Sequence, residues 1–346
     1  MSSIYDHSIK RRRVSSIWLY ALAAFFLILG LAWVVATGGW PAAIDRLSTF
    51  TTVLLGIFIE AAPFLLLGSL GSGVLEVFFQ GEDFSSRVPR HPLLGAMVGA
   101  FMGFFFPVCE CGVVPLTRRL FQKGLPVPVG IAFLLGAPAL NPIVLVSTLV
   151  AFGWGPVLWG RIGLTFLIAT LTGYIFSFQK DTTSLLNKVT LLQFQAERIH
   201  EKAIPPQRTW RQKARQVFTI TVDEFFEIGR YLVLGASLAA VLQTIVPQAS
   251  LLSIGQGQVV SVLVMITLAV LLSVCSTVDA FIALSFAGSF TTGSILAFLV
   301  FGPMVDIKST LMFLHVFQRK TVVYMILVPL FLTVLLTVFL NLNVGF

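Results

Sequence analysis

Charge is scarce in this sequence. Only 11% of its 346 residues are Asp, Glu, Lys or Arg, against about 25% in an average soluble protein, and 57% are hydrophobic. A soluble fold of this size needs a polar shell that 23 basic and 15 acidic residues cannot supply. The composition excludes a disordered chain and an ordinary soluble enzyme. It predicts a polytopic membrane protein, with about 20 apolar residues for each spanning helix.

Several chemical signatures are also missing. The three cysteines cannot build a secreted disulfide framework, and no zinc-finger spacing, nucleotide-binding loop, Ser-His-Asp order or zinc-hydrolase motif is present. We therefore expect no cofactor, no enzyme activity and no ATP-driven transport by this chain alone. The net charge is +8, and the basic residues cluster between the apolar stretches. The positive-inside rule explains this pattern without a nucleic-acid partner. The four histidines are expected at the surface.

The apolar stretches predict an all-α fold with about 9–10 membrane segments. Lys10–Arg13 precede an apolar run, 17–36, that is longer than a signal-peptide core, so we expect a first transmembrane helix with a cytoplasmic N-terminus in a bacterial inner membrane. The polar segment 179–216 is the expected cytoplasmic linker, and its leucines are expected on the membrane surface or packed on the protein. The predicted organisation is a tail and extra helix at 1–49, repeat 1 at 50–178, the linker at 179–216 and repeat 2 at 217–346.

The two halves resemble each other at a shift of 165 to 167 residues. FIEAAPFLLLG at 58–68 matches FFEIGRYLVLG at 225–235, which pairs Glu60 with Glu227. Cys109 falls opposite Cys275, and IAFLLGAPALNPIV at 131–144 matches LAFLVFGPMVDIKS at 296–309. Three anchors in the same order indicate an internal duplication.

Basic residues suggest how the repeats are oriented. If every apolar stretch crossed the membrane, Arg118, Arg119 and Lys123 would lie outside, and Arg319 and Lys320 would raise the same conflict. Both conflicts disappear if re-entrant hairpins precede them, with tips near 109–115 and 275–279. Each repeat then crosses an odd number of times, which predicts inverted repeats with broken helices, as in secondary transporters.

The most unusual segment is Pro-Val-Cys-Glu-Cys-Gly-Val-Val-Pro at 107–115. Thiolates favour soft ions such as Cu(I) and zinc, and trivalent arsenic belongs to the same class. Residues i and i+2 diverge on a regular helix, so the prolines and Gly112 favour a kinked segment with both thiols on one side. The alternative is that these buried cysteines are only small hydrophobes. We predict substrate contacts at Cys109, Glu110, Cys111 and Pro115.

The matching segment in the second half is Cys-Ser-Thr-Val-Asp at 275–279. If the two tips meet at a pseudo-two-fold axis, three sulfurs converge, and we predict a metal or metalloid site at Cys109, Cys111 and Cys275. Further substrate contacts are predicted at Ser276, Thr277 and Asp279. Asn141 is added to them, because Pro138 and Pro142 free backbone carbonyls beside it.

Ionisable residues inside apolar stretches are costly and suggest function. Asp306 is the first candidate for a proton-coupling carboxylate, and Glu60 and Lys308 join it. The alternative for Asp306 is an ion pair with Lys308 or an arginine that serves only structure. Glu227 has a similar alternative, a local pair with Arg230, and Arg161 either pairs with one of these glutamates or reaches for the membrane surface.

These motifs together resemble a known family. Pro-x-Cys-x-Cys-Gly-x-x-Pro at 107–115, Gly-Ala-Pro-Ala-Leu-Asn-Pro at 136–142 and Gly-Pro-Met-x-Asp-x-Lys at 302–308 are similar to those of the bacterial predicted-permease family typified by YraQ, which includes the organoarsenical efflux permease ArsP. The resemblance covers about 50–345. It implies an inner-membrane permease and, for the arsenical branch, export of trivalent organoarsenicals through cysteine contacts.

The leading hypothesis is therefore a proton-coupled efflux permease for a thiophilic metal or metalloid. The first alternative is a permease for a small sulfur-containing or anionic solute. The second is a non-transporting membrane subunit that docks a soluble partner through 179–216. The expected partners are membrane lipids and the small substrate, with a homo-oligomer left open.

Overall fold

The computed structural model describes residues 16–78, 89, 91–106, 108–179, 185–187, 190, 209–245 and 257–343. In these ranges the chain is helical, and the only β-pairing is an isolated antiparallel bridge between Leu186 and Phe317. The predicted all-α class is confirmed. The basic cluster 10–13, Pro107 and most of the predicted linker lie outside the described residues.

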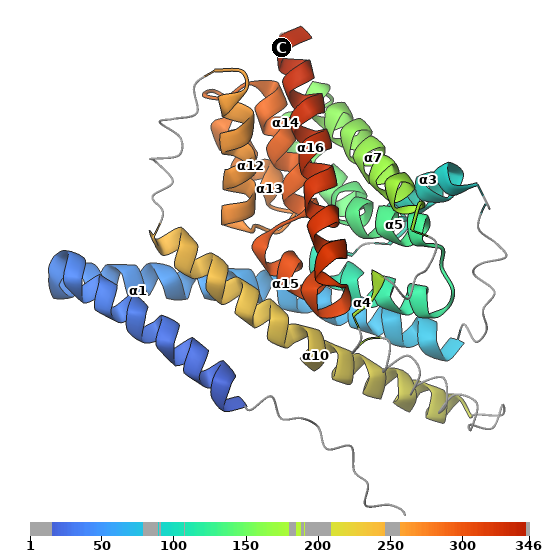
Figure 1. Ribbon diagram of the computed structural model, residues 1–346, viewed down its shortest axis with the longest axis horizontal. Helices are drawn as coiled ribbons and strands as arrows, with labels where there is room; N and C mark the ends of the chain where they lie inside the picture. Colours follow the sequence, from blue (N-terminus) through green and yellow to red (C-terminus); the bar gives the residue numbers. More distant parts are fainter. Residues whose placement is uncertain are drawn as a thin grey trace, which may run out of the picture. The chain divides into compact units, whose positions relative to one another are not determined.

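The first half contains one long helix followed by shorter ones (Figure 1). α1 covers 63 residues and both predicted N-terminal apolar segments. The chain divides into two units at Val53 and Leu54, and everything described below lies in the second unit, 54–346. The helices of this half are α1 (Ser16–Phe78), α3 (Pro92–Met102), α4 (Glu110–Gln122), α5 (Val127–Leu140), α6 (Pro142–Phe152) and α7 (Pro156–Phe176).

The second half repeats this order. α10 is a long helix that begins seven residues inside the predicted linker. Short helices flank a break at 273–278, and a second break at Val305 and Asp306 divides α14 from α15. The helices are α10 (Trp210–Ile245), α12 (Val260–Leu272), α13 (Asp279–Phe286), α14 (Thr292–Met304), α15 (Ile307–Val316) and α16 (Arg319–Asn343).

The same succession of a long helix, a broken pair, a broken spanning helix and a final long helix occurs in both halves. The first break lies between Met102 and Glu110, before most of the predicted tip at 109–115, because α4 already begins at Glu110. The break at Asn141, between α5 and α6, lies in the predicted proline-interrupted segment. Within the described part of the chain, six helical spans are long and apolar enough to cross a membrane, and α3 and α12 are shorter apolar helices. The order of elements agrees with the predicted duplication, whereas the inverted orientation of the repeats stays a prediction.

The broken spans form the centre of the second unit. The spans 127–152 and 292–316 are mostly buried, whereas 44–78, 210–245 and 319–343 keep most of their surface outside the protein. α5 contacts α14, and the short helices cross over between halves: α4 packs on α15, and α13 packs on α6. Each half therefore supplies a short helix to the broken span of the other.

Two glycines at matched positions let the long helices approach the short ones. A Cβ on Gly68 would lie 2.4 Å from Cα of Gly112, in the first turns of α4. A Cβ on Gly235 would lie 2.6 Å from Cα of Lys308, in the first turn of α15. Backbone approaches of this kind accept only glycine. They hold α1 and α10 directly against the helices that carry the charged residues described next.

Candidate substrate and ion site

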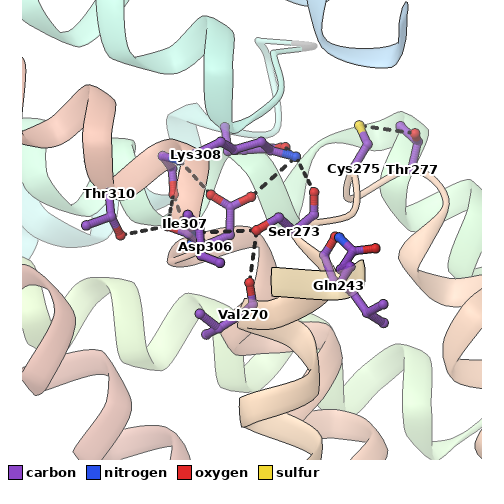
Figure 2. Close-up of polar contacts among 12 residues, drawn as sticks. Gln243, Val270, Ser273, Cys275, Thr277, Asp306, Ile307, Lys308 and Thr310 are labelled. Atoms are coloured by element: carbon purple, nitrogen blue, oxygen red, sulfur yellow. Dashed lines mark hydrogen bonds and ion pairs between the residues drawn. The ribbon is translucent and has the colours of Figure 1, made fainter. Parts of the chain in front are cut away.

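The side chain of Lys308 is the centre of a buried polar cluster. It is 1% exposed, and its Nζ contacts oxygens from three parts of the chain: the Ser273 carbonyl at 2.7 Å, Glu110 Oε1 at 2.9 Å and Asp306 Oδ2 at 3.3 Å. Figure 2 shows the lysine reaching over the Asp306 carboxylate toward the Ser273 carbonyl. A buried ammonium is tolerated only with such partners, so this lysine joins repeat 1 to repeat 2.

The Ser273 carbonyl is available because α12 ends there. Ser273 has φ of +46°, in the left-handed region, and forms the C-cap of α12. Carbonyls at a helix C-terminus carry partial negative charge and favour a cation. The Ser273 hydroxyl accepts a hydrogen bond from the backbone N–H of Ile307 at 3.3 Å, which ties the first break of repeat 2 to the second.

Glu110 brings two thiols to this lysine. Cys109 is the N-cap of α4, with extended backbone, and Glu110 and Cys111 begin the helix. The Cys111 thiol lies within interaction range of the Cys109 thiol. The extended backbone ends at Cys109, and Gly112 and the buried Pro115, which the sequence placed in a kinked segment, lie inside the continuous helix α4.

The third thiol comes from the other half. Cys275 lies within electrostatic range of Cys109, Glu110 and Lys308, and Cys111 lies within range of Glu110 and Lys308. All three cysteines are buried and free. The structure therefore places all three thiols within electrostatic range of the same Glu110–Lys308 pair, and their convergence on one ion stays a prediction.

Glu60 also belongs to this cluster. Its carboxylate lies close to the backbone of Cys275 and within electrostatic range of Lys308 and Glu110. Glu60 is half-buried on α1. Three carboxylates, those of Glu60, Glu110 and Asp306, therefore surround the one ammonium of Lys308.

Asp306 and Asn141 both cap the helix that follows a break. Asp306 Oδ1 accepts from the backbone N–H of Ser309 at 2.6 Å in a capping box. Asn141 Oδ1 accepts from the N–H of Ile143 at 2.9 Å, and its Nδ2 donates to the Val108 carbonyl at 3.3 Å. Asn141 thus positions the cysteine tip. The Asp306–Lys308 pair that the sequence left as an alternative for Asp306 is present.

A second buried ion pair lies beside the cluster. Arg161 on α7 donates to both oxygens of Asp279, at 2.9 and 2.7 Å, and to the Thr148 hydroxyl at 2.8 Å. The predicted partners of Arg161 were glutamates, so that prediction is wrong. A bidentate pair of this kind commits Asp279 to Arg161. Thr277 donates to the Cys275 sulfur at 3.5 Å, and Ser276 is buried in the same loop.

The basic residues of α4 that suggested the membrane orientation are buried. Arg118 pairs with Glu227 at 3.3 Å and Arg119 with Glu224 at 2.6 Å on α10, and Lys123 pairs with Glu76 at 3.2 Å on α1. Such residues are neutralised inside the protein, so their positions do not report a membrane side as free loop charges would.

Glu227 and His315 meet beneath α4. Glu227 pairs with Arg118 and with His315, and the local pair of Glu227 with Arg230 stays a prediction. His315 was expected at the surface. Its ring instead stacks on Tyr231, with centroids 4.3 Å apart, and its Nε2 lies 3.0 Å from Glu227 Oε1.

The three thiols do not form a ready-made metal cage. Among the described residues, no group of three or more His, Cys, Asp or Glu side chains is arranged to hold a metal ion. The metal assignment to Cys109, Cys111 and Cys275 stays a prediction.

Comparisons with known proteins agree with this architecture. The model of the ArsP_1 family, described as a predicted permease, matches residues 46–342. The chain belongs to this family. This match supports the predicted family over most of the chain. It also supports a membrane permease rather than an enzyme.

Two curated relatives match over most of their length. UPF0718 protein YcgR of Bacillus subtilis is 44% identical over 277 residues, which is 80% of this chain and 91% of that protein. A protein of Streptococcus mutans named "Putative two-component membrane permease complex subunit" is 38% identical over 270 residues, 78% of this chain and 87% of that protein. No solved structure matches the chain.

Sequence reasoning missed the connection from Glu110 to Lys308 and the part played by Ser273. One signal was available. At the shift of 165 residues that aligns the broken spans, Asp306 falls opposite Asn141 and Lys308 opposite Ile143, so the repeats differ in charge at these positions of the site.

Proposed function

We propose that the chain is a secondary permease that exports a thiophilic metal or metalloid species, of the trivalent organoarsenical kind, in exchange for protons. The observation that supports it most is the meeting of thiols from both repeats at the Glu110–Lys308 pair, where helices break. In membrane transporters, irregular backbone within the membrane forms substrate sites between repeats. Rocking one repeat against the other would then alternate access.

The chemistry of the site suits a soft electrophile. A neutral organoarsenical with two hydroxyl groups on arsenic can form two As–S bonds. Each As–O bond then breaks, and the thiol proton leaves with the hydroxyl group as water. The paired thiols Cys109 and Cys111 could take one arsenic together. Three carboxylates around one ammonium disfavour an anionic solute, which weakens that alternative.

Transport of trivalent methylarsenic into everted membrane vesicles tests this function. We expect gradient-dependent uptake that falls at least about tenfold in Cys109→Ser and Cys111→Ser, since a hydroxyl lacks the soft-ligand character of a thiolate. Cys275→Ser is expected to lose less, because its thiol has no partner sulfur within its own loop. Ser285→Ala, at an exposed serine of α13, is the matched control and should transport normally.

Vesicles with and without the native chain that take up equal amounts of arsenical would contradict the substrate class. A sulfur-containing solute would then be tested in the same vesicles. Uptake by a chain in which all three cysteines are serine, at the native rate, would show that the thiols do not bind the substrate.

A second candidate function is suggested by the Streptococcus mutans relative, whose name describes a permease complex subunit. Part of the linker packs on the membrane helices, so a partner bound to the linker can act on them. The backbone of Leu185 and Asn187 hydrogen-bonds with Gln318 and Val316 at the α15–α16 junction, at 2.8 and 2.9 Å, and Leu185 and Leu186 are buried. A stoichiometric partner after gentle purification, together with transport only by the complex, would favour this function.

A further inference from the structure

The short helices α4 and α15 lie side by side (Figure 1) and run in the same direction. Their first turns meet where Glu110 pairs with Lys308. Their far ends meet where the rings of Phe121 and Phe317 lie edge to face, with centroids 6.1 Å apart. Both helices therefore lead from the thiols to the place where the linker segment 185–187 is hydrogen-bonded to the α15–α16 junction. We call this end of the two helices the linker side.

The last turns of α4 carry a layer of buried ion pairs on the linker side. Three cations of α4 each pair with a carboxylate of a long helix, at 2.6 to 3.3 Å, and all three cations are buried. His315 of α15 joins the layer through Glu227. The layer therefore ties α4 to helices of both repeats. The ion-pair layer consists of Arg118, Arg119 and Lys123 on α4, Glu76 on α1, and Glu224 and Glu227 on α10.

This layer separates the thiols from the linker side. Arg118 follows Cys111 by seven residues, which is a rise of about 10 Å along a helix. Every residue of α4 is buried, so α4 leaves the thiols no opening toward the linker side in this conformation. A solute that moves along α4 between the thiols and the linker side must therefore pass the ion-pair layer.

Ion pairs suit a contact that opens and closes. The cost of taking two charges out of water nearly cancels their attraction, so a buried pair adds little net stability to the closed state. When the helices part, both charges regain water. An apolar contact would instead expose hydrophobic surface, at a cost proportional to its area. The ion-pair layer can therefore separate more easily than the contact between the apolar helices α5 and α14.

The other end of α4 has a close backbone contact that can act as a pivot. A Cβ on Gly68 of α1 would lie 2.4 Å from Cα of Gly112, so no side chains interlock the two helices at this point. Lys308 holds Glu110 in the same turn of α4. The first turn of α4 can therefore stay in place while its last turns move.

We propose that the ion-pair layer is the gate that closes the thiol site toward the linker side, and that α4 opens this gate by turning about Gly112 away from α1 and α10. The gate rests on the proposed permease function and deepens it, because alternating access needs a closure on each side of the site. The three cations and three carboxylates of the layer balance. An open gate would therefore offer a hydrated path without net charge, which suits a neutral solute.

Thiol labelling in membrane vesicles tests this gate without any substrate. A charged methanethiosulfonate that cannot the membrane permeate is added to everted and to right-side-out vesicles that contain the full chain, and mass spectrometry follows Cys109 and Cys111. Gln212→Cys, at an exposed position of α10, marks the vesicles in which the reagent reaches the linker side. In those vesicles we expect at least about tenfold faster labelling in Arg119→Met than in the native chain, because Glu224 loses its cation and a broken buried pair is strongly unfavourable.

A double variant distinguishes a gate from an ion pair that only holds helices together. Arg119→Met combined with Glu224→Leu replaces the pair by an apolar contact, which is often as stable as the pair or more stable. From the linker side we expect its thiols to be labelled at least about threefold more slowly than native thiols, since opening now exposes apolar surface. The matched control for a lost cation is Arg215→Met, at an exposed arginine of α10, which should be labelled at the native rate.

Labelling of the double variant from the linker side at the native rate or faster would overturn the gate, and so would labelling of Arg119→Met at the native rate. If Arg119→Met does not assemble in the membrane, the double variant decides alone. Transport of trivalent methylarsenic in the same vesicles separates the gate from the substrate class. If the native chain moves no arsenical but the labelling rates follow the expected order, the substrate class is wrong and the gate stands. If arsenical is transported and the labelling rates are equal, the permease function stands and the gate is wrong.

Discussion

The break in the spanning helix of repeat 1 and the break in repeat 2 are built alike but differ in charge. In repeat 1, Asn141 caps the following helix and its amide donates to the Val108 carbonyl. In repeat 2, Asp306 caps the following helix, and the carbonyl of Ser273, one residue before the counterpart of Val108, accepts from Lys308. Repeat 1 therefore fixes its hairpin tip with a neutral amide, and repeat 2 with an ion pair.

The two breaks also differ in burial and in the partners of their side chains. Ile143, opposite Lys308 in the repeat, is 47% exposed, whereas Lys308 is 1% exposed. The lysine crosses to Glu110 of repeat 1, and in the opposite direction Arg161 of repeat 1 crosses to Asp279 of repeat 2. The two halves thus share the same order of helices, while the first half supplies the thiol pair and Glu110 and the second supplies the Lys308 ammonium with Asp306.

The largest expected difference in stability between the two breaks follows from removing the Lys308 ammonium. Lys308→Met leaves Glu110 and Asp306 buried without their cation and should lower the free energy of unfolding by about 3–5 kcal/mol. Ile143→Met at the matched position is exposed and should change it by less than about 0.5 kcal/mol. Denaturant unfolding in detergent, followed by circular dichroism, measures both. Equal stabilities for the two variants would show that the ion pair does not distinguish the breaks.

Exchanging the N-cap residues Asp306 and Asn141 should change the free energy of unfolding by less, and by different amounts in the two repeats. Asp306→Asn keeps an N-cap acceptor of similar quality and removes one of three clustered negative charges, so we expect a loss below about 1 kcal/mol. Asn141→Asp removes the donor to the Val108 carbonyl and buries a new charge, which should cost about 1–3 kcal/mol. The same unfolding measurement compares them. A greater loss in Asp306→Asn would mean that its charge, and not its cap, stabilises repeat 2.

The broad features of the fold follow from the sequence for clear reasons. Apolar length predicts spanning helices, and prolines and glycines locate the breaks, so the positions of Cys109, Asn141 and Cys275 at or beside breaks could be predicted. The pairing of Glu110 with Lys308, and of Arg161 with Asp279, could not, because each joins residues more than a hundred positions apart through packing of α4 on α15 and of α7 near α13. The same limit applies to the charge argument from Arg118 and Arg119, whose partners Glu227 and Glu224 lie more than a hundred residues away. A basic residue looks alike in sequence whether it faces water or a buried glutamate.

The most direct measurement of the central claim, that the tips of the two repeats meet, is crosslinking with a short bifunctional thiol reagent. The chain has three cysteines, so digestion and mass spectrometry can assign every product without further variants, and Cys275→Ser is the control that should lose the inter-repeat product. We predict a crosslink that joins Cys275 to Cys109 or Cys111 in the native protein. Modification of both tips by single reagent molecules, with no product that joins them, would contradict the account.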